Sequence, residues 1–534
     1  MAGAAHLSLV LFAALSIATS QLSAQSGGCA QCHAEIAANY ARTGMGRSFS
    51  RLTAQTNRAD FLRENTFLHE ASDRYYEAVE RGGLFYLRRW QQDAEGRRFN
   101  LVEKRIDYAL GSGNHAVGFL HRTPDGRLLQ LPLSWYSANG GYWAMAPGYD
   151  RPDHADFRRD VDLECLFCHN AYPDEDRQEI PDAAVRFSGE LPEGVDCARC
   201  HGVASGHAEA ARRGDAAAVR STVLNPARLS RERSLEVCMQ CHLETTTNLL
   251  PHALRRSGRG YFSYDPAEPL ADYVLHFDHA AGQEDKFEVV SAVYRLRQSK
   301  CFARSPMTCT TCHDPHHIER GAAGRERHNA VCKSCHETKL ADEGVHVRQA
   351  DCVACHMPQR VADDALHVRM TDHRILARPL VAAEPAAADE TGGAAYQGPV
   401  ALYYPDKRPR SPNFVLDLAL AQVKDFANLS AGLPALAQAI ERFAPRDPRY
   451  SYFLGEGLRR QGRATEAARA YRAALSVEQS YWPAGLGLGL ALAAAGDLDD
   501  AATALAQAFV ASGVAVAVAV ALADVHYRLG RLEE

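Results

Sequence analysis

The sequence lacks long blocks of like charge, and beyond its first residues it lacks long hydrophobic runs. Lysine and arginine together number 59 against 65 acidic residues, and the net charge of −6 is spread along the chain. This balance gives no indication of a nucleic acid or an anionic membrane surface as a partner. No later run reaches the ~18 apolar residues that a bilayer-spanning helix requires. We therefore expect no transmembrane helix in the mature chain.

The N-terminal region is the exception to this pattern. Residues 7–18 form an apolar stretch, and Leu22-Ser23-Ala24 follows it. Such a stretch before a small-x-small sequence is typical of a secretory signal peptide, here residues 1–24. The preceding positive charge is limited to the amino terminus and His6, so an uncleaved membrane anchor is the alternative. We expect an exported, periplasmic protein.

Cysteine is scarce outside one repeated motif, because 14 of the 15 cysteines belong to seven copies of Cys-x-x-Cys-His. This spacing is the attachment signature of c-type haem. The predicted attachment residues are Cys29, Cys32, Cys165, Cys168, Cys197, Cys200, Cys238, Cys241, Cys309, Cys312, Cys332, Cys335, Cys352 and Cys355. The predicted proximal iron ligands are His33, His169, His201, His242, His313, His336 and His356.

The geometry of the motif explains why it suits covalent haem. Two cysteines three positions apart lie on one side of a helical turn, so both sulfurs reach the two vinyl groups of one porphyrin. The next residue then presents an imidazole to the iron. A zinc ribbon pairs two Cys-x-x-Cys knuckles without an adjacent histidine, and thioredoxin-like pairs occur once per domain. The sequence therefore predicts seven covalently bound haem c groups.

Cys301 is the one cysteine outside these motifs. A free cysteine commonly serves as a small buried hydrophobic residue. The alternative is a reactive thiol beside a haem.

Composition divides the rest of the chain into three further regions. Residues 25–379 are predicted to form the seven-haem cytochrome domain, with little regular structure because packed porphyrins would supply its apolar core. Within it, residues 50–150 alternate aromatic and aliphatic segments with turns such as Gly82-Gly83 and Asp125-Gly126, which predicts a small antiparallel β lobe. Residues 380–410 are rich in Ala, Pro and Gly, which predicts a linker or an extended arm.

Residues 411–534 carry an internal repeat. Gly462, Gly496 and Gly530 are each 34 residues apart, as are Gly455 and Gly489. Small residues at such positions let two helices of a hairpin approach closely, and the period resembles the tetratricopeptide repeat. Such repeats usually bind protein partners, although a helical hairpin array without a ligand groove is the alternative. The predicted fold is mixed: a haem-packed domain with a β lobe, followed by an α-helical array.

Each iron has room for one more ligand, and the histidines outside the motifs exceed the seven positions about twofold. His316 lies three residues beyond His313 and can reach the iron of a neighbouring haem. His115 would bring the β lobe onto a haem, and Met45 is the best methionine candidate. The histidines that local context favours are His115, His207, His316, His346 and His373. Hydrogen-bonding or surface roles are the alternative for each of them.

Several segments resemble the cytochrome c-554-type multihaem family, specifically members fused to tetratricopeptide repeats. These segments are ECLFCHNAYP, GVDCARCHG, VCMQCHLETT, YRLRQSKCF with MTCTTCHDPH, and DCVACHMPQR with MTDHRI. The resemblance covers residues 29–408 and implies that His279, His367 and His373 are axial ligands. All seven motifs end in histidine, whereas the related pentahaem nitrite reductases have a lysine in the catalytic motif. The resemblance therefore implies haem packing and electron transfer more firmly than it implies a substrate.

Two functions follow from these observations. The first is an electron-transfer protein that passes electrons between donor and acceptor proteins and docks a protein partner through its repeats. The second is an oxidoreductase in which one five-coordinate haem binds a small nitrogen or sulfur compound, a site that needs charge-stabilising donors on its open face. The sequence assigns no catalytic residue.

Overall fold

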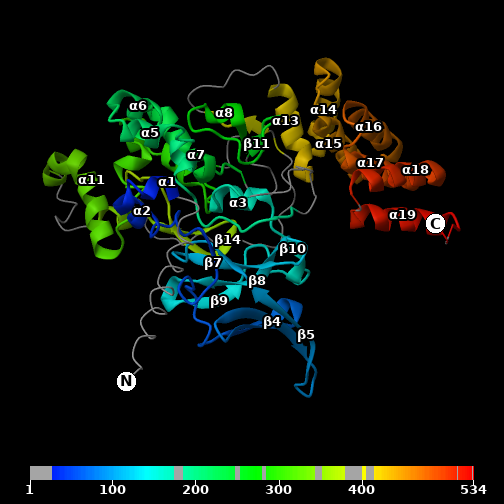
Figure 1. Ribbon diagram of the computed structural model, residues 1–534, viewed down its shortest axis with the longest axis horizontal. Coiled ribbons are helices and arrows are strands. Elements are labelled where there is room, and N and C mark those ends of the chain that lie inside the picture. The colour runs from blue at the N-terminus through cyan, green and yellow to red at the C-terminus, as the bar shows by residue number, and fades with distance from the viewer. Residues whose placement is uncertain are drawn as a thin grey trace, which may run out of the picture.

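A computed structural model describes residues 27–173, 185–246, 253–279, 284–342, 351–378, 400–404, 414–513 and 515–531, together with residues 398 and 533. Three parts are distinguishable in Figure 1: a β lobe, a central region that carries the Cys-x-x-Cys-His motifs, and a C-terminal array of helices. The predicted signal peptide and most of the predicted linker lie outside the described residues.

Two antiparallel sheets form the β lobe, as the alternating segments predict. One sheet has the order β2-β3-β4-β5, and the other has the order β1-β6-β7-β8-β10 with β9 paired to β8. The strands are β1 Phe49–Arg51, β2 Thr66–His69, β3 Arg74–Arg81, β4 Leu84–Gln92, β5 Arg98–Ile106, β6 Tyr108–Leu110, β7 Ala116–Arg122, β8 Leu128–Tyr136, β9 Tyr142–Met145 and β10 Arg159–Asp160.

Positive-φ glycines make the turns of this lobe. Gly82 and Gly83 have φ of +60° and +76° and join β3 to β4, the conformation that a two-residue hairpin turn requires. Gly126 has φ of +87° and lies in the β7–β8 turn. Inside the lobe, Phe61 packs against Trp143 with ring centres 5.2 Å apart. One hydrophobic cluster of the lobe contains no motif residue, while a second joins lobe residues such as Leu128 to Leu166 of the second motif.

Short helices and connecting segments make up the central region (Figure 1). Its helices are α1 Gly27–Ala30, α2 Ala34–Tyr40, α3 Leu163–His169, α4 Ala198–His201, α5 His207–Arg212, α6 Ala216–Ser221, α7 Arg231–His242, α8 Leu270–Tyr273, α9 Ala292–Arg297, α10 Lys300–Ala303, α11 Gly321–Asp342 and α12 Cys352–His356. Its strands are β11 Ala253–Arg255, β12 Val274–His279, β13 Gln359–Ala362 and β14 Ala365–Thr371. The helix α11 is longer than the sequence suggests.

The C-terminal array consists of antiparallel helices in sequence order, as the 34-residue period predicts. They are α13 Phe414–Val423, α14 Leu429–Phe443, α15 Pro448–Arg460, α16 Ala464–Val477, α17 Trp482–Ala495, α18 Leu498–Ala511 and α19 Val516–Arg528. Glycine sets the helix spacing: a Cβ on Gly455 would lie 2.6 Å from the ring of Tyr471, and one on Gly489 would lie 2.3 Å from Leu505. The small residues of the repeat thus allow the close helix contact expected of them.

The array is joined to the central region by a strand, an ion pair and a shared core. Strand β15 (Val400–Leu402) pairs with β12, so this part of the predicted linker belongs to a sheet. Asp417 of α13 accepts hydrogen bonds from Arg256 Nη1 and from Tyr450 Oη, both at 2.7 Å. Phe277 of β12 belongs to the same hydrophobic cluster as the helices of the array. The array is therefore fixed to the motif region by these contacts.

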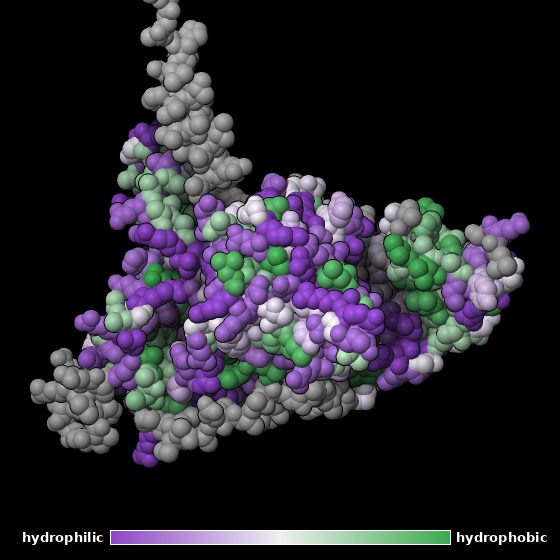
Figure 2. Space-filling model, turned by 90° about the horizontal axis from the view of Figure 1, so that it is seen from below, coloured by the Kyte–Doolittle hydropathy of each residue, from purple (hydrophilic) through white to green (hydrophobic). Residues whose placement is uncertain are grey.

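Hydrophobic side chains gather on the surface of the array. Figure 2 shows them at its right end, beside a largely hydrophilic face on the rest of the molecule. Val510 is 81% exposed, and Val516 and Val520 of α19 are 76% and 64% exposed. Of the helices in the described ranges, none has the length and hydrophobicity that a membrane crossing needs.

Candidate functional site

A single large cavity in the central region collects the motifs. Its volume is about 3550 Å³, several times the ~300–1,000 Å³ of a pocket for one small ligand. All seven motif histidines line it, and of the motif cysteines only Cys165 is absent from its lining. Segments that lie far apart in the chain therefore present the same chemical groups to one shared space.

Local helical turns position the cysteines and histidine of each motif. The backbone N–H of His33 donates to the carbonyl of Cys29 at 2.8 Å, and that of His201 donates to Cys197 at 2.9 Å. In the fifth motif the N–H of His313 donates to the carbonyl of Cys309 at 3.0 Å. Residues three and four apart on such a turn share a face. The two thiols and the imidazole thus point to the same side.

The thiols of the motifs differ in their ionisation. All fifteen cysteines lie in the described ranges and are free thiols. Burial raises the pKa of Cys200 to about 12 and that of Cys332 to about 11. Hydrogen bonds with thiols of other motifs instead lower the pKa of Cys241 and that of Cys309.

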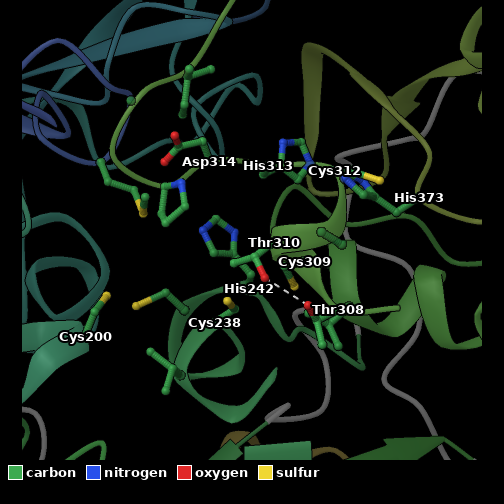
Figure 3. Close-up of a pocket in the computed structure, with 18 of the residues that line it drawn as sticks. Cys200, Cys238, His242, Thr308, Cys309, Thr310, Cys312, His313, Asp314 and His373 are labelled. Carbon is green, nitrogen blue, oxygen red and sulfur yellow. Dashed lines mark hydrogen bonds between the residues drawn. The ribbon is translucent and has the colours of Figure 1, made fainter. Parts of the chain in front are cut away.

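Thiols of different motifs also contact one another. A hydrogen bond with Cys241 raises the pKa of the Cys168 thiol, which joins the second motif to the fourth. Cys238 and Cys309 make a similar contact between the fourth and fifth motifs, and Figure 3 shows both beside His242. The motifs are therefore packed against each other rather than distributed over separate domains.

Backbone carbonyls hold the Nδ1 atoms of five histidines that line the cavity. A carbonyl oxygen accepts only from a protonated Nδ1, and the neutral ring then has its lone pair on Nε2, the atom that a metal binds. The distance from Nδ1 to the carbonyl oxygen is 3.2 Å from His169 to Ser48, 2.8 Å from His201 to Leu224, 3.1 Å from His207 to Val219, 2.6 Å from His356 to Leu376, and 3.1 Å from His373 to Thr371. Two of these five, His207 and His373, belong to no motif.

Three motif histidines each lie opposite a histidine from outside the motifs. Ring centres are 6.5 Å apart for His33 and His207, 5.8 Å for His201 and His316, and 6.2 Å for His313 and His373. The nitrogen of an imidazole ligand lies ~2 Å from the metal that it binds and ~1 Å from the centre of its own ring. Two imidazole ligands on opposite sides of one metal therefore have ring centres roughly 6 Å apart. Each separation is close to this value.

Figure 3 shows His313 and His373 on the same side of the cavity, with His242 facing it from α7. Burial, together with the positive charge that His373 and His328 would carry, lowers the pKa of His313 to about 4. A neutral imidazole is the form that binds metals. His313 is therefore in its ligand form at neutral pH.

The structure brings four of the seven predicted additional ligands to the cavity: His115, His207, His316 and His373. The sequence placed His316 beside a neighbouring motif, and the structure gives it His201 of the third motif as its neighbour. Met45, the methionine candidate, and Cys301 also line the cavity, and burial raises the pKa of Cys301. That any of these groups binds iron stays a prediction.

Two further predicted ligands, His279 and His367, do not line the cavity. His279 is buried in β12, where burial lowers its pKa to about 4, and it is not part of the lining. His367 Nε2 lies 3.2 Å from Asp150 Oδ2, and its ring packs 5.0 Å from that of Tyr136 in the β lobe. His346 lies outside the described residues. His279 and His367 had been chosen from the family resemblance, which gives no position in space.

One histidine in the lining was missed. His328 lies in α11 with its ring centre 5.3 Å from that of His313. It precedes Cys332 by four residues, so on a continuous helix both side chains occupy one face. That spacing is visible in the sequence, but it has meaning only once the helix is known to extend from Gly321 to Asp342.

Two family profiles match parts of the chain. The tetratricopeptide repeat profile matches residues 416–483 and 486–534, which confirms the repeats predicted from the 34-residue period. A profile for the doubled CXXCH motif matches residues 303–341, which include the fifth and sixth motifs. The first kind of module is typical of protein binding and the second of haem c attachment. A comparison with curated proteins gave no match.

Solved structures with weak similarity include the following three. "MamA MSR-1 C2" is 23% identical over 22% of this chain and 67% of its own, with a TM-score of 0.21. "Crystal structure of the Sgt2 TPR domain from Aspergillus fumigatus" is 22% identical over 24% of this chain and 87% of its own, with a TM-score of 0.21. "First TPR of Spaghetti (RPAP3) bound to HSP90 peptide SRMEEVD" is 14% identical over 22% of this chain and 90% of its own, with a TM-score of 0.20.

Proposed function

We propose that this protein is an exported multihaem c-type cytochrome that carries seven covalently bound haems and transfers electrons between redox partners. The observation that carries the proposal is the convergence of all seven Cys-x-x-Cys-His motifs on one cavity. The resemblance to the cytochrome c-554-type family, stated above on five segments, supports the same function.

The residues present fit the group that they would hold. Each motif offers thiols and an imidazole from one side of a turn, and the cavity has the volume for several large planar groups. Bound haem supplies one-electron chemistry, with a potential set by the axial ligands, burial and nearby hydrogen bonds. The chain contributes fixed imidazole orientations, since backbone carbonyls hold the Nδ1 atoms of residues such as His201 and His356.

The spacing of the histidines supports three axial pairs: His33 with His207, His201 with His316, and His313 with His373. His316 lies close in sequence to the fifth motif but beside the histidine of the third. Such a ligand would hold two neighbouring haems near each other. Contact between neighbouring motifs, as at Cys238 and Cys309, supports the same close packing.

The helical array is proposed to dock a protein partner. Its tetratricopeptide repeats are a module that usually binds proteins, and the array is joined to the motif region through β15 and Asp417. A partner bound there would be held at a constant position relative to the cavity.

Production of the full chain in a host with a c-type haem maturation system tests the proposal. We expect the intact mass to exceed that of the polypeptide by seven haem groups, resistant to acid extraction because the thioether bonds are covalent. Replacement of Cys309 and Cys312 by alanine should remove one group. A protein that folds and yields no covalent haem would exclude the proposal.

The oxidoreductase is the second candidate, and one observation favours it. Among the described residues, five histidines outside the motifs line the cavity, against seven motif histidines. An iron that is opposite none of them and opposite no histidine outside the described ranges, such as His346, would have either methionine, such as Met45, or an open coordination position. Electron paramagnetic resonance of the oxidised protein separates the two functions. Seven low-spin ferric signals favour the carrier, and a high-spin signal that responds to nitrite or sulfite favours the enzyme.

A further inference from the structure

The second, third and fourth Cys-x-x-Cys-His motifs contact one another through their second variable residues. These residues are Phe167 of α3, Arg199 of α4 and Gln240 of α7, and each directly precedes the second cysteine of its motif. Arg199 Nη2 donates to the carbonyl of Phe167 at 2.8 Å, and Gln240 Nε2 donates to the carbonyl of Arg199 at 3.0 Å. Arg199 is therefore hydrogen-bonded to the motifs on both sides of its own in the sequence.

Aromatic rings surround the guanidinium group of Arg199. Its Cζ lies 4.0 Å from the ring centre of Phe167, 5.3 Å from that of Phe262 and 5.6 Å from that of Tyr172. Arg199 is only 3% exposed, so this charge is held away from water. The attraction between a cation and an aromatic ring is stronger when water is excluded from both. Stacking therefore holds the side chain in addition to its hydrogen bond.

The charge of Arg199 has no carboxylate beside it. Among the residues that the structure describes, none forms an ion pair with this guanidinium, whereas the equally buried Arg295 pairs with Asp372 at 2.6 Å. Asp196 Oδ1 accepts the backbone N–H of Arg199 at 3.2 Å, and Arg199 Nε is shielded from solvent without a hydrogen-bond partner in the described structure. Arginine remains protonated in proteins. The central region thus buries a permanent positive charge at the junction of three motifs.

This charge lies directly behind the wall of the cavity. Cys168, Cys200 and Cys241 follow the three contacting residues in the sequence, and all three cysteines line the cavity. Under the proposed function, each of these cysteines would carry a haem. A charge in a water-excluded interior acts on its neighbours more strongly than it does in water. Because ferrous haem has one positive charge fewer than ferric haem, a fixed cation nearby favours the ferrous state.

We propose that Arg199 is a positioning residue that locks the second, third and fourth motifs into one unit and raises the reduction potential of at least one haem attached to them. The effect on the potential rests on the proposed function, and the lock does not. Lysine at this position keeps the charge but lacks the planar fork that stacks on the rings and donates to Phe167. Glutamine loses both the charge and the stacked guanidinium. The two variants therefore separate charge from geometry.

Hydrogen exchange of the purified full chain tests the lock, whatever cofactor the chain carries. In Arg199→Gln, the amides of α3, α4 and α7 should exchange about tenfold faster or more, because a hydrogen bond from a charged group is lost. Arg199→Lys should also exchange faster at these helices, and it replaces the glutamine variant if that variant does not fold. Arg220→Gln, which removes an exposed arginine of α6, should exchange as the wild type does. Wild-type exchange in the Arg199 variants overturns the lock.

Redox titration of the haem-loaded chain, followed by visible absorption, tests the charge once the covalent haem content has been measured. Arg199→Gln should lower at least one midpoint potential, Arg199→Lys should restore most of it, and Arg220→Gln should shift none. Potentials that are unchanged in Arg199→Gln, or lowered equally by lysine and glutamine, overturn the role of the charge. A wild type without covalent haem excludes the proposed function instead, and the exchange measurement still decides the lock.

Discussion

The rings of His201 and His316 lie with their centres 5.8 Å apart and their planes 15° from parallel. His201 belongs to the third motif, and its Nδ1 is held by the carbonyl of Leu224 at 2.8 Å. His316 follows the fifth motif. The contact between these two rings therefore joins the third motif to the segment that follows the fifth.

Replacing His316 by alanine should therefore remove one axial ligand from the haem of the third motif. In the haem-loaded protein we expect a new high-spin ferric signal from one haem, while the haem count stays at seven. Electron paramagnetic resonance and visible absorption measure this change. His317→Ala is the matched control, because His317 is the exposed neighbour and does not line the cavity. A variant that retains only low-spin haems would rule out His316 as a ligand.

Gly455→Ala should destabilise the helical array. Alanine normally stabilises a helix by ~1 kcal/mol relative to glycine, but here its Cβ would lie 2.6 Å from the ring of Tyr471. Overpacking of this kind costs ~1–3 kcal/mol. Urea denaturation followed by the helical circular dichroism signal measures the loss. In a Tyr471→Leu background the same substitution should cost less. An unchanged cost in that background would show that the ring is not the obstacle.

Asp417→Asn should weaken the attachment of the array. Asp417 is 9% exposed and accepts hydrogen bonds from Arg256 and Tyr450. Loss of the negative charge leaves Arg256 without this partner, which we expect to lower the free energy of unfolding by ~1.5–3 kcal/mol. Asp499→Asn removes an exposed carboxylate of the same array and should change stability by less than ~0.5 kcal/mol. A double-mutant cycle with Arg256→Gln should show coupling; additive effects would disprove the link.

Glu288→Gln should alter the pH dependence of stability. Burial, together with the charges of Asp364 and Glu244, raises the pKa of Glu288 to about 9. Between the usual pKa of 4.5 and about 9, the folded chain holds a proton here that the unfolded chain releases. The contribution of Glu288 to the free energy of unfolding therefore falls as pH rises through that window. The glutamine variant should show a shallower decline, because Glu244, whose pKa burial raises to about 8, still contributes its own part; urea midpoints across the window measure the difference. Glu35→Gln, at an exposed position, should leave the decline intact.

The sequence predicted those features that depend on local spacing. Residues close together in the chain are enough to identify the turn at Gly82-Gly83, the repeat glycines such as Gly455 and the seven motifs. The structure has the corresponding hairpin and helices. It did not predict β15, because a strand in a segment rich in Ala, Pro and Gly forms only through its pairing with β12.

For the candidate site, the sequence identified the residues of the motifs but not their arrangement in space. Motif residues were identified individually, but their convergence on one cavity depends on tertiary contacts. His367 was chosen by analogy, and the structure gives it Asp150 as a partner instead.

The shared cavity also constrains how the protein is made. Under the proposed function, attachment of seven haems would require access to every motif, yet in the folded chain residues such as Cys168 and Cys241 face one another inside the central region. Maturation would then have to precede closure of this region during biogenesis. The β lobe has a core cluster without motif residues and can fold earlier, whereas the core of the array includes Phe277 of the motif region. Under the proposed function, a cell short of haem would accumulate chains with a folded β lobe and a motif region open to proteolysis.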